Sequence, residues 1–286
     1  MTGMTDGIIA GYDGSAGSDE ALRWAAREAW ARGTALTICL AWPTSDLLQL
    51  GDWGTRDRAR QLGRDILARG MRLVKAVPDL PDVRSVLAEG PPAHVLCGRS
   101  SSAEMVVVGS HGHGGLADSW LGSVAWQVAC HGRGRVVVVR GQWRPVNQPP
   151  GPVVAGVDGS PASQEALTFA FEEAALRNVP LVAVCALADT PGRLGGMRRM
   201  EDDFSRQMTL HEKEHPETTV LRQVTSGTPR SALLTAAAEA QLLVAGSRGL
   251  VGVEGMSLGS VAGALVHHSP CPVAVVHPAA GGPRPR

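Results

Sequence analysis

The sequence contains almost no lysine and carries no net charge. Lysine occurs only at Lys75 and Lys213, and 27 Lys and Arg residues balance 27 Asp and Glu residues, for a formal net charge of +0. Because the basic residues form no long run, we expect no surface that holds nucleic acid or lipid through bulk charge. A Walker A loop needs a lysine directly after a glycine. Lys75 follows Val74 and Lys213 follows Glu212, which excludes P-loop nucleotide hydrolysis.

Long apolar runs and a disulfide framework are also absent. No apolar stretch approaches the ~20 residues of a membrane-spanning helix, and the first residues lack the basic and apolar segments of a signal peptide. The odd number of cysteines, scattered through apolar stretches, is typical of small buried side chains in a reducing compartment. They are Cys39, Cys97, Cys130, Cys185 and Cys271. We therefore expect a cytoplasmic protein without membrane or nucleic-acid partners.

The chain is an internal duplication. Its 286 residues have the length of two globular domains. The phrase Gly-Ile-Ile-Ala-Gly-Tyr-Asp-Gly-Ser at 7–15 returns as Pro-Val-Val-Ala-Gly-Val-Asp-Gly-Ser at 152–160, and a glycine motif at 105–112 returns at 242–249. We expect a first domain at 1–141, a Pro/Gly-rich linker at 142–151, a second domain at 152–278 and a disordered tail at 279–286.

Each half alternates short apolar runs with helical patterns. The first helix is indicated by Leu22, Ala25, Ala26 and Ala29 and ends at Gly33, and its counterpart carries Leu167, Ala170, Phe171 and Ala174. Strands are predicted at 8–12, 35–42, 83–87, 105–108 and 136–139, then at 153–157, 181–187, 219–224, 242–245 and 273–276, with further first-half helices up to Gly70 and at 93–98. Such alternation predicts right-handed βαβ crossovers and two α/β domains, each a doubly wound parallel sheet covered on both faces. The 56–72 stretch alternates arginines with acids and leucines, which is typical of a solvated helix face.

The glycine motif predicts an anion site. It reads Gly109-x2-Gly112-x9-Gly122-Ser123 in the first half and recurs as Gly246-x2-Gly249-x9-Gly259-Ser260. In an open parallel sheet, ligands bind at the carboxyl ends of the strands, where the strand order reverses. Glycine lets backbone amides approach phosphate closely, and a serine at a helix start adds a hydroxyl to the helix amides.

On these motifs the sequence resembles the universal stress protein family, in its tandem form, over nearly the whole chain. The Gly-x-Asp-Gly-Ser end of strand one, the Gly227-Thr228-Pro229 element and the glycine motif carry the resemblance. It implies two Rossmann-like, adenine nucleotide alpha hydrolase-like domains, each with five parallel strands in the order 3-2-1-4-5. It also implies ATP in each half, with adenosine near the strand-one aspartate, phosphates in the glycine loop and Mg²⁺ held, if present, through the phosphates. One departure is His131-Gly132-Arg133-Gly134-Arg135, where the family has a Cys-Pro-type pair before the last strand, which forms the family's dimer seam.

Carried onto this sequence, the resemblance gives each half one set of cofactor-binding residues. In the first half they are Gly11, Asp13, Ala41, Gly109, Ser110, His111, Gly112, Gly122, Ser123 and Val124. In the second half they are Gly156, Asp158, Ala186, Gly246, Ser247, Arg248, Gly249, Gly259, Ser260 and Val261. Arg248 would add a positive charge opposite the phosphates.

The same residues could have purely structural roles instead of binding a ligand. Asp13 and Asp158 also suit a turn at a strand-to-helix junction, the glycines suit tight turns, and Ser123 and Ser260 suit helix caps. His111 and His113 have no Cys or carboxylate companion that would favour a metal pair.

Other nucleotide and hydrolase machinery is not indicated. The Gly11-Tyr-Asp-Gly14 turn lacks the Gly-x-Gly-x-x-Gly spacing of a dinucleotide oxidoreductase. No Gly-x-Ser-x-Gly nucleophile elbow precedes a helix in the right place, and no metal-ligand cluster stands out. We expect a regulator that binds one ATP per half, with no catalytic residue and only slow hydrolysis, and with the halves paired as a pseudo-dimer or chains as a homodimer. The alternatives are a slow ATPase, an adenylyl-transferring enzyme or a nucleotide-free scaffold.

Overall fold

The structure is a computed structural model that describes residues 6–42, 53–113, 121–140, 150–187, 194–250 and 258–278. The predicted tail at 279–286, and all of the predicted linker except residues 150 and 151, lie outside these ranges. The chain divides into two compact units, Met1–Val139 and Arg140–Arg286.

The first unit contains β1 (Ile8–Gly11), α1 (Ala16–Arg32), β2 (Leu36–Trp42), α3 (Trp53–Val74), β3 (Val83–Glu89), α4 (Pro92–Arg99), β4 (Met105–Gly109), α5 (Ser123–His131) and β5 (Arg135–Val139). The second contains β6 (Val153–Gly156), α6 (Pro161–Arg177), β7 (Leu181–Leu187), α7 (Leu194–Glu214), β8 (Val220–Ser226), α8 (Pro229–Ala236), a 3₁₀ turn (Ala237–Glu239), β9 (Leu242–Gly246), α9 (Ser260–His268) and β10 (Val273–Val276).

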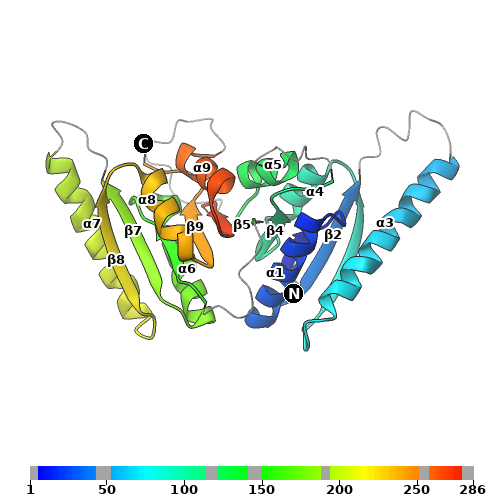
Figure 1. The fold of residues 1–286 in the computed structure, drawn as a ribbon, viewed down its shortest axis with the longest axis horizontal. Coiled ribbons are helices and arrows are strands. Elements are labelled where there is room, and N and C mark those ends of the chain that lie inside the picture. The colour runs from blue at the N-terminus through cyan, green and yellow to red at the C-terminus, as the bar shows by residue number, and fades with distance from the viewer. Residues whose placement is uncertain are drawn as a thin grey trace. The chain divides into compact units, whose positions relative to one another are not determined.

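Each unit is the predicted doubly wound sheet. The strand order is β3-β2-β1-β4-β5 in the first unit and β8-β7-β6-β9-β10 in the second, and the pairings between neighbours are parallel. Helices cover both faces of each sheet (Figure 1). The predicted α/β class and the order 3-2-1-4-5 are therefore confirmed. The order reverses between β1 and β4, and between β6 and β9, which is where a crevice for a ligand forms in such sheets.

The first helix of each unit packs as its sequence pattern predicts. Leu22, Ala25, Ala26 and Ala29 on α1 are fully buried, and so are Leu167, Ala170 and Phe171 on α6. Burial of a leucine or phenylalanine side chain contributes about 1.5–3 kcal/mol, so these faces hold the helices on the sheet. Helix α1 ends, as predicted, at Gly33, which caps it with a positive φ of 64°.

Two sequence expectations differ from the structure in detail. The helical stretch predicted to end at Gly70 continues to Val74. Gly70 is instead a packing glycine, because a Cβ there would lie 2.9 Å from Cε1 of Tyr12. The last strand of the first unit forms without a Cys-Pro pair: Gly134 takes a φ of 65°, the amide of Arg133 donates to Ser100 Oγ at 2.8 Å, and β5 pairs with β4 in register.

Candidate functional site

The turn after the first strand of each unit is organised by an aspartate. Asp13 Oδ1 accepts hydrogen bonds from the amide and the hydroxyl of Ser15, at 2.9 and 2.6 Å. Ser15 in turn caps α1 by accepting from the amide of Ser18. In the second unit Asp158 Oδ1 accepts from the amide of Ser160 at 2.9 Å. The reading as a turn carboxylate is therefore correct for both aspartates, since this geometry is an Asx turn.

The second carboxylate oxygen ties this turn to the glycine loop. Asp13 Oδ2 accepts from the amide of His113 at 3.1 Å, and Asp158 Oδ2 accepts from the amide of Leu250 at 3.2 Å. Residues about a hundred positions apart in each half are thus joined at the carboxyl ends of β1 and β4, and of β6 and β9. Sequence reasoning did not predict this tie, because it needs the crossover that brings the two strands together.

The hydrogen bonds to Asp13 favour the charged form of its side chain. Its partial burial acts to raise the pKa, but hydrogen bonds from Ser15, Ser18 and His113 outweigh burial and lower the pKa below its usual value. The carboxylate form is the one that accepts all of these bonds. Asp13 is therefore ionised in the folded protein.

One glycine of each loop sits against the aspartate. A Cβ on Gly112 would overlap Oδ2 of Asp13, and a Cβ on Gly249 would overlap Oδ2 of Asp158. The second glycine of the motif is thus required by the tie between loop and turn, whether or not a phosphate also approaches it.

The first glycine of the motif faces the start of the first helix. A Cβ on Gly109 would lie 2.5 Å from the carbonyl oxygen of Gly17, and one on Gly17 would overlap the carbonyl oxygen of His111. In the second unit a Cβ on Gly246 would lie 2.9 Å from the methyl group of Ala162. Gly109 and Gly246 are therefore needed for close packing of the strand end against the helix, rather than for a tight turn.

The last glycine of the motif caps a helix without a side chain. Gly122 and Gly259 are the N-caps of α5 and α9, and neither helix has a side-chain cap hydrogen bond, whereas α1, α6 and α8 do. Ser123 and Ser260 are the first helical residues, so the reading of these serines as caps is wrong. The amides of a helical first turn have no intrahelical partner, and uncapped amides favour an anion.

In the second unit all of these features line one cavity of ≈ 370 Å³. Small-molecule sites measure roughly 300–1,000 Å³. The ten predicted residues of the second half all contribute to its wall. Nine further lining residues are Val157, Ser163, Val184, Met200, Pro229, Leu233, Ala245, Leu250 and Ala262. Most of these nine are apolar, so one wall of the cavity suits a flat apolar group while Arg248 and the start of α9 suit an anion.

Sequence reasoning missed these apolar residues because no motif marks most of them. Pro229 belongs to the Gly-Thr-Pro element, whose sequence indicates no specific contact. Leu233 follows one helical turn later on α8. Met200 lies on α7, for which no separate prediction was made. A search for apolar residues one turn beyond Pro229 would have found Leu233.

A buried hydroxyl in this cavity wall lacks a partner. Ser247 is fully buried, and its Oγ has no hydrogen-bond partner among the described residues. In the first unit the matching Ser110 Oγ lies 2.9 Å from Nδ1 of His111. A polar ligand atom would satisfy Ser247, whose unpaired hydroxyl is otherwise costly.

In the first unit the ten predicted residues lie at the corresponding places. They occupy the end of β1 (Gly11, Asp13), β2 (Ala41), the end of β4 and its loop (Gly109, Ser110, His111, Gly112) and the start of α5 (Gly122, Ser123, Val124). The structure joins the aspartate, the loop and the helix start through the contacts given above, and Ala41 pairs with Ala88 of β3.

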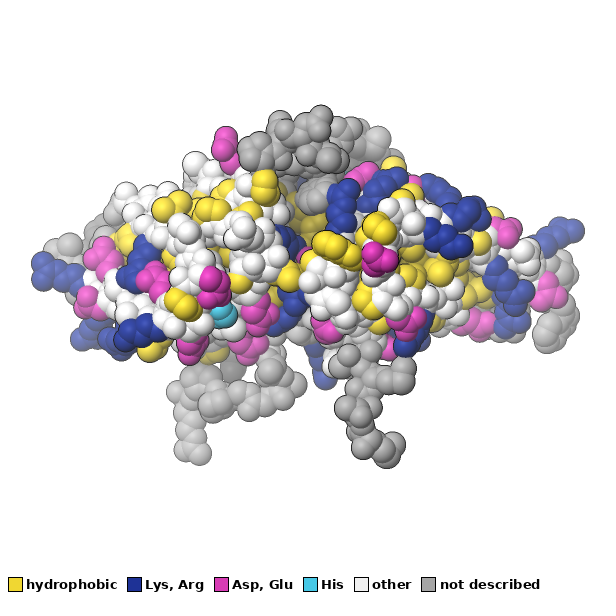
Figure 2. Space-filling model, turned by 90° about the horizontal axis from the view of Figure 1, so that it is seen from below, with side chains coloured by type: hydrophobic (Ala, Val, Ile, Leu, Met, Phe, Trp, Pro, Cys, Tyr) yellow, Lys and Arg dark blue, Asp and Glu magenta, His cyan; other side chains and the backbone are white. Residues whose placement is uncertain are grey.

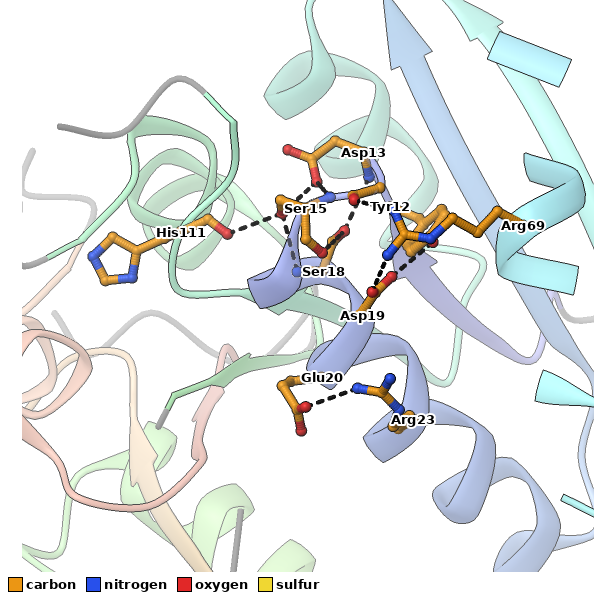
Figure 3. Close-up of polar contacts among 10 residues, drawn as sticks. Tyr12, Asp13, Ser15, Ser18, Asp19, Glu20, Arg23, Arg69 and His111 are labelled. Atoms are coloured by element: carbon orange, nitrogen blue, oxygen red, sulfur yellow. Dashed lines mark hydrogen bonds and ion pairs between the residues drawn. The ribbon is translucent and has the colours of Figure 1, made fainter. Parts of the chain in front are cut away.

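The first unit adds a polar network beside its turn (Figure 3). The Tyr12 hydroxyl donates to Asp19 at 2.7 Å, Asp19 pairs with Arg69 of α3, and Arg69 donates to the carbonyl oxygen of Gly14 at 2.6 Å. This network joins β1, α1 and α3 at the turn. The second unit has Val157 in place of Tyr12, so its turn lacks the hydroxyl.

Two general findings concern metals and membranes. Among the described residues, no three His, Cys, Asp or Glu side chains gather where they could hold a metal ion. Within the same residues, no helix combines the length and the apolar character needed to cross a bilayer.

Comparison with known proteins gives one consistent result. The sequence profile of the universal stress protein family matches residues 4–140 and again residues 151–277. A universal stress protein of Mycolicibacterium smegmatis is 33% identical over 294 residues, which cover 95% of this chain and 97% of that protein. One of Mycobacterium tuberculosis is 34% identical over 287 residues, 94% of this chain and 96% of that one. The crystal structure of a universal stress protein from Archaeoglobus fulgidus shares the fold, with a TM-score of 0.73 and 21% identity over 96% of this chain and 98% of that chain.

Proposed function

The chain belongs to the universal stress protein family, and from this premise we propose that it is an ATP-binding regulatory protein with one nucleotide in each half. Nucleotide occupancy would act by changing the population of conformations or of bound partners, which requires different affinities for the two states. We assign no catalytic residue. The predicted domain limits, cytoplasmic location and pairing of halves or chains remain predictions.

The observation that carries the proposal is the cavity of the second unit. The cavity has a volume of ≈ 370 Å³, and its wall contains all ten residues chosen from the sequence. One of these, Ala186, adds to an apolar part of the wall together with Val184 and Leu233. That side suits adenine, because a purine ring is flat and largely apolar on its faces.

The polar side of the cavity suits the phosphates. Arg248 supplies a cation, α9 supplies uncapped amides, and Ser247 supplies a buried hydroxyl that has no partner among the described residues. Asp158 would accept from the adenosine end, in addition to its bond from Leu250. Mg²⁺ that accompanies the nucleotide would be held through the phosphates.

The first half would bind the same ligand through the same arrangement. Its aspartate, its glycine loop and the uncapped start of α5 repeat the contacts of the second unit. His111 stands where the second unit has Arg248, so the first site lacks that permanent charge.

The test is to count nucleotides released from the purified full chain by denaturation, followed by chromatography, and to titrate emptied protein with ATP. Two ATP per chain are expected. Gly259→Ala should leave one ATP per chain, because Gly259 lines the cavity. Its added Cβ would lie 3.4 Å from the nearest protein atom, the carbonyl oxygen of Ser247, which is an ordinary contact distance. Gly122→Ala is the matched variant for the first site.

The alternatives give different results. A chain that is free of nucleotide and has no affinity for ATP would be a scaffold. Rapid appearance of ADP or AMP would indicate an ATPase or an adenylyl-transferring enzyme.

A further inference from the structure

A basic groove lies between helix α3 and strand β3 of the first unit. It consists of two hollows of ≈ 380 and ≈ 400 Å³ that share Arg64, Leu67 and Ser85. The other lining residues are Trp42, Arg60, Ala68, Met71, Arg72, Lys75, Leu87 and Glu89. Lys and Arg side chains also gather among hydrophobic ones on the first unit, in the right half of Figure 2.

The positive charges of this groove are largely unpaired. Of the described residues that line it, only Glu89 is acidic, and it pairs with Arg60 at 2.8 Å. Arg64, Arg72 and Lys75 are exposed and form no ion pair with any described residue. The 56–72 stretch presents the solvated helix face that its sequence indicates, since Arg64 and Arg72 are exposed, and the part of it that lines the groove is basic.

The second unit has an ion pair at the corresponding place. Its edge strand β8 has Arg222 at the third position, where β3 has Ser85. Arg222 donates two hydrogen bonds to Glu212 of α7, at 2.9 and 2.7 Å, and so bridges strand and helix. The first unit therefore has a basic groove where its own duplicate has an ion pair between strand and helix.

Strand β3 borders the groove with an unpaired edge. It is the last strand of its unit's sheet, and among the described residues only β2 pairs with it. An edge strand offers backbone donors and acceptors to an added strand. At one end of the groove the buried indole nitrogen of Trp42 also has no partner among the described residues.

We propose that the basic groove docks an acidic, extended segment of a partner protein, which adds as a strand along β3. Alternate side chains of a strand share one face, so glutamates at every second position would face Arg64, Arg72 and Lys75. Seven residues of strand span about 23 Å, and the helix from Arg64 to Lys75 rises about 16 Å, so a segment of this length is long enough to pass all three cations. The binding is independent of the nucleotide sites.

The test measures the anisotropy of a labelled, end-blocked Glu-Thr-Glu-Thr-Glu-Thr-Glu peptide titrated with the full chain. Binding should weaken as salt rises, and the same peptide with Gln for Glu should bind at least about ten-fold more weakly. Lys75→Glu with Ser85→Arg, which introduces the bridge of the second unit, should cost about ten-fold in affinity. Arg64→Gln with Arg72→Gln should do the same, and Arg206→Gln, an exposed arginine of α7, should change nothing.

Hydrogen exchange separates strand addition from simple anion binding. The bound peptide should slow amide exchange within Val83–Glu89. Absence of binding, equal binding of the Gln peptide, or full affinity in both groove variants would overturn the proposal. So would displacement by equimolar pyrophosphate without protection of β3, which would identify a small-anion site instead.

Discussion

The Oδ2 atom of Asp158 accepts a hydrogen bond from the backbone amide of Leu250 at 3.2 Å, which ties the end of β6 to the loop after β9. Its other oxygen serves Ser160. An asparagine can accept only one of these two bonds and turns an NH₂ group toward the other amide. We expect Asp158→Asn to lower the free energy of unfolding by about 1–2 kcal/mol, measured by urea denaturation.

The same variant tests the second site, because the loop that it releases would hold phosphate. ATP affinity should fall about ten-fold at the second site in calorimetric titration, a loss of about 1.4 kcal/mol. Asp13→Asn is the matched change for the first site and should spare the second. Equal affinity in all three proteins would contradict a role of the tie in binding.

Acid should remove the stabilisation that Asp13 provides. Burial acts to raise its pKa, but the hydrogen bonds from Ser15, Ser18 and His113 together lower it in the folded protein. The contribution of its charge is therefore complete above the unfolded pKa of about 3.9 and is lost as the pH falls through the lower folded value. The stability difference between wild type and Asp13→Asn should shrink in that acidic window. A difference that stays constant there would show that Asp13 is not charged at this site.

Tyr12 provides a reporter, since it is the one tyrosine of the chain. Burial, and then the hydrogen bond and charge of Asp19, raise its pKa to about 12. Between pH values of about 10 and 12 the folded protein should therefore show little tyrosinate absorbance while the denatured chain shows much. The stabilisation from neutral Tyr12 is complete below about 10 and is lost as the pH rises through the folded value.

Asp19→Asn should shift this tyrosinate titration to lower pH, because it removes the negative charge beside the hydroxyl. A titration near the ordinary tyrosine value in the folded wild type would mean that the network does not form in solution.

Replacement of glycine by alanine should have opposite effects on stability at two positions. Gly33 has a φ of 64° and Gly98 lies inside α4, and a Cβ on either meets no atom within 4 Å. Gly33→Ala should destabilise by about 1 kcal/mol through backbone strain, while Gly98→Ala should stabilise by about 0.5–1 kcal/mol through helix propensity. Denaturation midpoints of the two variants check this. The same sign for both would show that local backbone conformation is not the controlling factor.

The spacing of apolar residues was enough to predict much of the fold, because the pattern that marks a buried helix face can be seen within a short stretch of sequence. Leu22, Ala25 and Ala29 mark the buried face of α1, and Gly33 marks its end. Gly70 was misread as a helix end, because only the folded structure brings Tyr12 against it. Helix α7 received no separate prediction.

Some residues of the candidate site could be predicted from the sequence, and others could not. The glycines and aspartates could be chosen from sequence, since they recur at fixed spacing. The bond from Leu250 to Asp158 and the apolar wall with Leu233 and Met200 depend on contacts across crossovers. So does the environment of Ser247, whose hydroxyl has no partner within the described part of the chain. No sequence spacing encodes such contacts.

The close approach of Gly17 to the loop after β4 restricts how the two copies could diverge. The second copy has Ala162 at the place of Gly17, so its loop stands far enough away for a methyl group, whereas in the first copy that methyl would overlap the carbonyl oxygen of His111. An alanine at position 17 would therefore require this loop to move outward, so the two copies accept different side chains at equivalent positions.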